Sequence, residues 1–205
     1  MGSSTFAVGS LDALRTLLRD GPLELREGDD VVIVPTAAAF TGVTEASLLT
    51  SSAFDEFDVH VETLMVTERA TTDDDYYANR VLNADVVVLC DGSALHARAV
   101  WRANDFGDAI NMASTLVAVG EVASAICEVM IDPRGGAPAS GLGFRRGAAL
   151  CVPSSDEQMR RTRSLLKDVV LVAIGPTGIV GHDGDQWRVL AGDVVVTLGP
   201  DAVEL

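Results

Sequence analysis

The chain has 205 residues, 48% of them hydrophobic, and a formal net charge of −15 at neutral pH. This length and apolar content predict one globular domain over residues 1–205 and exclude a disordered chain. The excess of acidic residues disfavours nucleic acids and anionic membranes as partners, because like charges repel. No apolar run reaches the ~18–20 residues of a membrane-spanning helix. The start of the chain lacks the pattern of a signal peptide.

Cysteine and histidine are too sparse to suggest a disulfide framework or a metal site. Cys90, Cys127 and Cys151 lie in apolar stretches without Cys-x-x-Cys spacing. They predict reduced thiols in the core of a cytoplasmic protein. The histidines are far apart in the sequence, at His60, His96 and His182. We therefore expect no metal ion, and we expect no cofactor.

In chain order, the first predicted elements alternate between helix and strand. A helix over 11–18 has leucines at spacings of three and four residues. The next elements are a strand over 31–35, a helix over 44–57, a strand over 60–66, a helix after the capping residues 71–73, and a strand over 85–90. The predicted inner face of the helix over 44–57 consists of Leu48, Leu49 and Phe54.

The second half begins with helices over 93–103 and 105–112, a strand over 116–119 and a helix over 122–130. Glycine and proline then predict a loop over 132–141. The remaining elements are a strand over 148–152, a helix over 156–166, and short strands over 169–174, 178–180, 187–190 and 194–198, with a hairpin turn at 182–185.

The helix over 156–166 and the residue just after it carry the dense cation cluster of the chain, formed by Arg160, Arg161, Arg163 and Lys167. We interpret this cluster as a solvated face that pairs with nearby carboxylates, those of Asp156 and Glu157, rather than as a nucleic-acid site.

Alternating strands and helices over the first two-thirds of the chain predict a three-layer α/β fold. Its mainly parallel sheet would be covered by helices on both faces and followed by a C-terminal run of short strands. The strands over 31–35, 85–90 and 116–119 are apolar throughout, so we expect parallel neighbours. Ligand sites in such sheets form beyond the carboxyl ends of the strands. The loops at Thr36, Asp91 and Gly120 should therefore converge.

The most informative stretch runs from the strand over 116–119 through Gly120 to a helix that begins at Val122. Strand, tight glycine turn and helix form the elbow on which many hydrolases hold a nucleophile. The same turn directs backbone N–H groups toward a developing oxyanion. The residue expected at the tip is Val122, whose side chain cannot attack a carbonyl group.

This stretch resembles the Gly-Thr-Ser-Ala-Gly-Ala signature of the S51 peptidases, which include cyanophycinases and aspartyl dipeptidases. That family is similar in fold to the class I glutamine amidotransferases, a flavodoxin-like arrangement. The signature is matched at Gly120, Ala123 and Ala125. Glu121 stands for Thr, Val122 for the nucleophilic Ser and Ser124 for the second Gly.

Three further stretches are similar to the family. The strand at 31–37 ends in Pro-Thr-Ala, and 141–143 reads Gly-Leu-Gly. The strand and loop at 84–93 retain Gly92 of a Thr-Gly-Gly motif, whereas Cys90 and Asp91 depart from it. The resemblance therefore extends over most of the chain, from the first of these strands to the C-terminal short strands.

The resemblance implies a serine nucleophile, a histidine base and a supporting carboxylate. Val122 occupies the nucleophile position. The base of the family follows a later strand in an Asp-Gln-His-Phe context, whereas the corresponding stretch here, 150–155, contains no histidine. The joint absence of both residues predicts a catalytically inactive relative with a binding or structural role.

Two alternatives stay open. An active serine hydrolase, a dipeptidase or a cyanophycinase-like amide hydrolase, would need a displaced nucleophile. Ser124 with His182 as its base is the candidate pair, and Cys90 and Cys127 are weaker candidates. The other alternative is a small-ligand sensor that uses the old cleft. The sequence identifies neither the ligand nor a protein partner, and it is compatible with a homodimer.

The predicted pocket at the sheet edge consists of Asp91, Gly92, Ser93, Gly120, Glu121, Val122 and Asp132. In the family, the loop of Ser93 supplies an oxyanion contact, but a serine before a helix is also an N-cap candidate. The pocket carboxylates could bind a cation or a basic ligand, or transfer protons. At a helix N-terminus, Glu121 is favoured by roughly 0.3–1 kcal/mol, but it would repel an anionic transition state.

Overall fold

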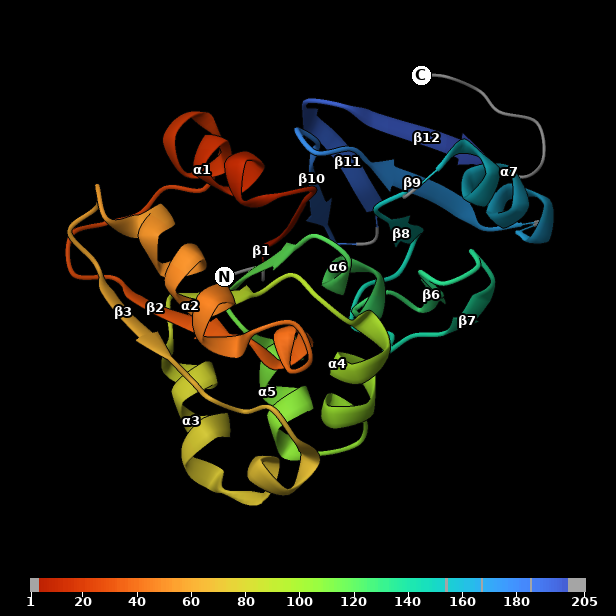
Figure 1. The fold of residues 1–205 in the computed structure, drawn as a ribbon. Coiled ribbons are helices and arrows are strands. Elements are labelled where there is room, and N and C mark those ends of the chain that lie inside the picture. The colour runs from red at the N-terminus through yellow and green to blue at the C-terminus, as the bar shows by residue number, and fades with distance from the viewer. Residues whose placement is uncertain (1–3, 154, 167, 185, 199–205) are drawn as a thin grey trace.

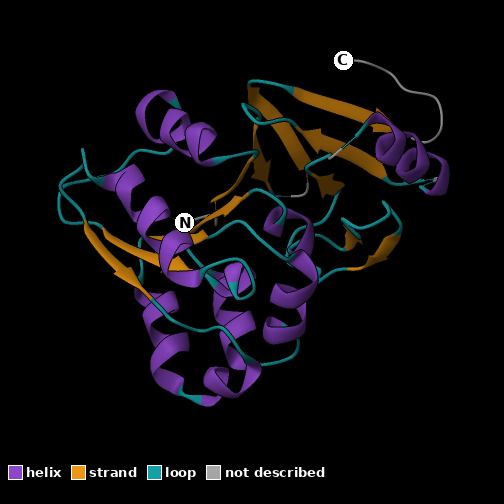
Figure 2. Ribbon diagram, in the orientation of Figure 1, coloured by secondary structure: helices purple, strands orange, loops and turns teal. Residues whose placement is uncertain are grey.

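The computed structural model describes residues 4–153, 155–166, 168–184 and 186–198. It is a three-layer α/β fold with helices on both faces of a central sheet (Figures 1 and 2). The strand order of this sheet is β11-β10-β1-β5-β4-β2-β3. Its strands are β1 (Ser4–Val8), β2 (Asp30–Val34), β3 (His60–Thr63), β4 (Val86–Leu89), β5 (Thr115–Val119), β10 (Ile179–Asp183) and β11 (Gln186–Ala191).

The core of the central sheet is parallel, as the apolar runs predict. β4 pairs in parallel with β5 on one side and with β2 on the other. The expectation of parallel neighbours among these three strands is therefore confirmed. β1, which the sequence did not predict, pairs in parallel with β5, and the antiparallel β10–β11 hairpin extends the sheet beyond it. Asp185, part of the predicted hairpin turn, lies outside the described residues.

Helices cover both faces because the central strands are apolar on both sides. One face is covered by α3 (Asp75–Asn83), α4 (Ala94–Trp101), α5 (Asp105–Met112) and the short α6 (Val122–Ala125). α1 (Leu11–Asp20) and α2 (Val43–Ser51) cover the opposite face. In Figure 1, α3, α4 and α5 lie below the sheet and α1 lies above it.

The predicted inner face of the helix over 44–57 is wrong for two of its three residues. Leu48 is 67% exposed and Leu49 is 46% exposed, whereas Phe54 is buried. The predicted helix is in fact an α-helix that ends at Ser51, followed by a 3₁₀ turn at Ser52–Phe54. Because this change of winding breaks the assumed period, α2 turns its small polar residues toward the sheet.

The helix predicted over 122–130 is also too long. α6 ends at Ala125, and β6 (Val129–Ile131) follows within the same apolar run. β6 pairs antiparallel with β7 (Pro138–Ser140), which lies inside the predicted loop over 132–141. A short apolar run is compatible with a buried helix or a buried strand, and periodicity alone does not distinguish them.

The C-terminal short strands are divided between two sheets. β10 and β11 join the central sheet, whereas β8 (Ala149–Cys151), β9 (Val170–Ile174) and β12 (Val194–Leu198) form a three-stranded sheet. α7 (Asp156–Leu165) packs against this smaller sheet over its own apolar cluster. In Figure 1, β10 and β11, the smaller sheet and α7 lie together at the upper right.

The arginine cluster on α7 does not form the expected ion pairs. Within the described residues, no salt bridge joins Arg160, Arg161 or Arg163 to a carboxylate of Asp156 or Glu157. Arg160 and Arg163 instead line a pocket between α7 and the smaller sheet. Lys167 lies outside the described residues.

The three cysteines are buried free thiols, as predicted. In the part of the chain that the structure describes, no helix is long and apolar enough to span a membrane.

Candidate functional site

The elbow after β5 turns at Gly120, not at Val122. Gly120 has φ of +67°, the left-handed region that favours glycine. A Cβ atom at this position would collide with the carboxylate of Asp91. Glu121 and the residues of α6 have ordinary helical backbone. In a hydrolase elbow the nucleophile itself occupies the strained position, so the prediction of Val122 at the tip is wrong.

The side chain of Val122 is fully buried. It packs in the apolar cluster between the central sheet and α3–α6. Val122 therefore does not line a pocket at the sheet edge, which corrects its place in the predicted pocket. The helical backbone of α6 explains the difference, because it directs this side chain inward.

The carboxylate of Asp91 joins the two loops that follow β4 and β5. Its Oδ1 accepts a hydrogen bond from the backbone N–H of Gly92 at 2.7 Å and another from the backbone N–H of Glu121 at 2.8 Å. Gly92 has φ of +140°, and a Cβ atom there would collide with the backbone of Ala37. The Asp91 carboxylate thus occupies the point toward which the elbow directs its N–H group.

Glu121 lies beside this carboxylate and is half-buried. Burial raises the pKa of its carboxyl group above the usual value, and the nearby charge of Asp91 raises it further. The Asp91–Glu121 pair therefore concentrates negative charge at the carboxyl ends of β4 and β5.

An open depression with a volume of about 440 Å³ lies over these strand ends. Asp91 and Glu121 supply its acidic groups, and Gly92 also lines it. Its walls come from α1, from α2 with the loop before it, and from the segment after β8, through Leu11, Thr41, Ala46, Leu49, Thr50 and Val152. The volume is in the range of pockets for small molecules.

The residues of these walls were not predicted from the sequence. The wall residues belong to no motif, and Leu49 was assigned to the buried face of α2. The pairing of β2 with β4 places the loop before α2 beside the strand ends. This pairing is evident only once the sheet order is known, so the sequence alone does not place Leu49 at the depression.

The remaining predicted pocket residues lie elsewhere. The hydroxyl of Ser93 accepts a hydrogen bond from the backbone N–H of His96 at 3.2 Å, so Ser93 is the N-cap of α4. Asp132 follows β6 and forms an ion pair with Arg134 at 2.8 Å. Hydrogen bonds from Arg134 hold the pKa of Asp132 below its usual value. Neither residue lines the depression.

Ser124 is buried and faces away from the depression. Its hydroxyl accepts a hydrogen bond from the backbone N–H of Ile131 at 2.8 Å, which ties α6 to β6. Together with Glu121 and Gln158 it lines a narrow crevice behind the elbow. These contacts are typical of a serine with a structural role.

His182 lies at the wrong end of the sheet to act as a base at the elbow. It pairs with Thr5 of β1, which in turn pairs with Leu116 of β5. Leu116 precedes Gly120 by four positions, roughly 13 Å along a strand. The ring Nε2 of His182 lies 3.1 Å from the carbonyl oxygen of Arg146.

Cysteine and metal chemistry also lack support at this site. Burial raises the pKa of Cys90 to about 11 and that of Cys127 to about 12, so both stay thiols at neutral pH. Within the described residues, no three His, Cys, Asp or Glu side chains are placed to hold a metal ion.

No family model and no curated protein matches the sequence. Solved structures do match the fold. A peptidase from an acI-B1 actinobacterium superimposes with a TM-score of 0.72 and 16% identity over 99% of this chain and 97% of that one. A candidate peptidase E protein from Listeria monocytogenes EGD-e gives 0.70 and 13% identity over 93% and 99% of the two chains. At these identities the comparison establishes the fold, and the chain has the flavodoxin-type α/β fold of these peptidases.

Proposed function

We propose that this protein is a non-hydrolytic binding protein built on a peptidase fold. The observation that carries the proposal is the position of the Asp91 carboxylate, which accepts the backbone N–H groups of Gly92 and Glu121. An acyl hydrolase needs such donors free for the oxyanion of its transition state. Here the carboxylate of Asp91 occupies them.

The energetic consequence is large. Removing a single oxyanion donor from a serine hydrolase costs roughly 10²–10³ in rate. A carboxylate at the same place also repels the developing negative charge, and Glu121 adds a second acidic group beside it. This electrostatic arrangement supports binding of a ligand that donates hydrogen bonds.

The absence of a nucleophile supports the same proposal. Val122 is buried and has no reactive atom, and the hydroxyl of Ser124 is engaged with Ile131. The hydroxyl of Thr50 contacts the buried thiol of Cys90 at 3.4 Å. No histidine is among the described residues that line the depression.

The depression supports a small-molecule ligand. Its volume of about 440 Å³ suits a ligand of modest size. A hydrogen-bond donor on that ligand would face the free oxygen of Asp91 and the carboxyl group of Glu121, while Leu11 and Leu49 would contact its apolar part. A sensor function would use the same contacts.

An active hydrolase is the second candidate, because solved peptidases share the fold. Such a hydrolase would need a displaced serine nucleophile, and Glu121, whose raised pKa suits proton transfer, would be its base at the elbow.

A serine-reactive fluorophosphonate probe separates the two candidates. We expect that the probe does not label the folded protein. An active serine peptidase, treated in the same way, is the positive control and should be labelled. Stoichiometric labelling of one residue would contradict the proposal. A thermal-shift screen of small amines and amides tests the binding role independently, because a ligand of the native state raises the melting temperature. Stabilisation that disappears in Glu121→Gln is the expected result.

A further inference from the structure

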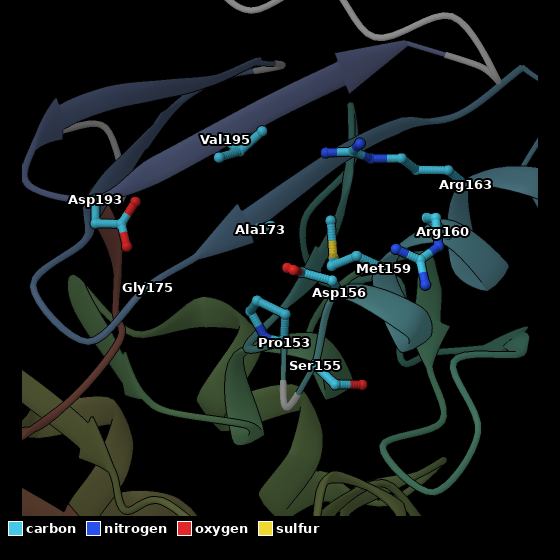
Figure 3. A pocket seen from close by; sticks show the side chains of 10 residues that line it. All are labelled: Pro153, Ser155, Asp156, Met159, Arg160, Arg163, Ala173, Gly175, Asp193 and Val195. Atoms are coloured by element: carbon cyan, nitrogen blue, oxygen red, sulfur yellow. The ribbon is translucent and has the colours of Figure 1, made fainter.

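Another pocket, with a volume of about 450 Å³, lies between α7 and the smaller sheet (Figure 3). Arg160 and Arg163 of α7 line it, as do Asp193, which directly precedes β12, and Val195 within β12. None of the polar residues of the elbow depression lines this pocket. It is therefore a separate site, built from the C-terminal third of the chain.

Two arginines face this pocket without an acidic partner. Arg160 and Arg163 are three positions apart on α7, so they project from neighbouring points of one helix face. In the described part of the chain, neither forms a salt bridge, although the chain has twice as many acidic residues (30) as basic ones (15). The Nε atom of Arg163 is buried and has no hydrogen-bond partner among the described residues.

The rest of the pocket has an apolar middle and two carboxylates, those of Asp156 at the start of α7 and Asp193 on the far side. Figure 3 shows the guanidinium of Arg163 extended over β9 toward Val195, with Met159 nearby. Asp193 lies on the opposite side of the pocket from the two arginines, and its carboxylate points toward the interior. No ion pair of Asp193 occurs within the described residues.

We propose that this pocket binds a zwitterionic small molecule, with its phosphate or carboxylate at Arg160 and Arg163 and its amine at Asp193. Guanidinium groups recognise both anions through paired N–H donors. Met159 and Val195 would contact the aliphatic part between the two ends. Asp193 would reject a ligand with negative charge at both ends, so the pocket selects for opposite charges.

The inference is independent of the proposed function at the elbow. Its residues belong to α7, β9 and β12 and to the segments next to these elements, whereas the elbow depression depends on the ends of β4 and β5. Activity measurements therefore test the proposed function at the elbow, and binding measurements at this pocket test the present proposal, so either can be contradicted without the other.

Isothermal titration calorimetry with three probes tests the pocket. O-phosphoethanolamine and γ-aminobutyrate carry an amine with a phosphate or a carboxylate, and methyl phosphate lacks the amine. We expect saturable binding of at least one of the amine-bearing probes, and the comparison of these two identifies the anion. Methyl phosphate should bind at least about tenfold more weakly than the phosphate probe if phosphate is the anion.

Four variants assign the contacts. Arg163→Gln and Arg160→Gln should each weaken binding about tenfold or more. The matched control is Arg161→Gln, which removes the same charge from α7 at a position that does not line the pocket and should change the affinity less than about twofold. Asp193→Asn should weaken the amine-bearing probes and leave methyl phosphate unchanged. Circular dichroism confirms folding, and the exposed Arg160 provides a variant with little structural risk.

Equal weakening by Arg161→Gln would show general electrostatic attraction and overturn the site. So would the absence of saturable binding of all three probes to the folded wild-type protein. If Asp193→Asn leaves the affinity for the amine-bearing probes unchanged, the proposed selectivity for zwitterionic ligands is wrong.

Discussion

The backbone N–H of Glu121 donates a 2.8 Å hydrogen bond to Oδ1 of Asp91. This contact connects the ends of two neighbouring parallel strands, β4 and β5. The same oxygen accepts the N–H of Gly92. A carboxylate with these two donors stabilises the elbow, and in the proposed function it also prevents the elbow from stabilising an external oxyanion. The stability of the elbow and the proposed loss of hydrolysis therefore depend on one side chain.

Replacing Asp91 tests the structural part of this relationship. Asp91→Ala removes the acceptor of two exposed backbone donors and should lower the free energy of unfolding by about 0.5–1.5 kcal/mol, because water can replace part of the lost interaction. Asp91→Asn should lower it less, because the amide oxygen can still accept. Urea denaturation measures both. Asp58→Ala is the control, since the exposed Asp58 carboxylate has no hydrogen bond within the described residues, and it should change the stability by less than about 0.5 kcal/mol. Equal losses of unfolding free energy in Asp58→Ala and Asp91→Ala would show that the Asp91 carboxylate does not stabilise the elbow.

Replacing Gly120 tests the close approach of the elbow to Asp91. Gly120→Ala combines a left-handed backbone with a collision against the Asp91 carboxylate. Gly28→Ala provides the backbone strain alone, because Gly28 has φ of +82° and no heavy atom near the added Cβ. Strain alone should cost about 1–2 kcal/mol, and Gly120→Ala should cost more.

The double variant of Gly120→Ala with Asp91→Ala separates the two contributions. Because Asp91→Ala removes the colliding atoms, the two changes should be less than additive in equilibrium unfolding. Strict additivity would mean that the carboxylate does not contact the elbow.

The pH dependence of stability tests the environment of Glu121. Its pKa is raised above 4.5 in the folded protein, first by burial and then by the charge of Asp91. The unfolded chain therefore binds fewer protons than the folded protein just above pH 4.5, and this group lowers the stability as the pH rises through its folded pKa. Glu121→Gln should gain stability relative to wild type between pH 4 and pH 7.

Glu157→Gln, at an exposed glutamate in the first turn of α7, is the matched control for the removed charge. Unfolding curves of wild type and both variants at the two pH values supply the comparison. A stability difference for Glu121→Gln that does not change with pH would contradict the raised pKa.

Restoring a serine should not restore a nucleophile. Val122→Ser places a hydroxyl group in the apolar cluster where Val122 is fully buried. The loss of packing and the buried polar group should together cost about 1–4 kcal/mol. The variant should not react with a fluorophosphonate probe, because its hydroxyl lacks both access and a base. Labelling of this serine would show that the elbow can present residue 122 to solvent.

The sequence predicted most of the framework because its signals are local. The β-branched run of β2 and the apolar runs of β4 and β5 are buried on both faces, which leaves little choice but parallel central strands. The outward turn of Leu48 was not predictable from period alone, because a 3₁₀ turn changes the winding after Ser51. The end of α6 was missed because Val129–Ile131 continues the apolar run as a strand.

The site was harder to predict because its contacts are not local. An aspartate and a glycine after β4 indicate a loop at the sheet edge. That the Asp91 carboxylate reaches Glu121, thirty residues later, follows only from the pairing of β4 with β5. The same holds for His182, whose distance from the elbow depends on the antiparallel pairing of β10 with β1.

Turnover by the wild-type protein is the most direct test of the central claim. An Asp-containing dipeptide and an aspartyl anilide, the substrates that the S51 resemblance implies, are incubated with purified protein beside an active peptidase E and the variant Glu121→Gln. Wild type and variant should release product no faster than buffer. Product release by the wild type that Glu121→Gln abolishes would contradict the central claim, and would assign the acidic pair at the elbow to hydrolysis.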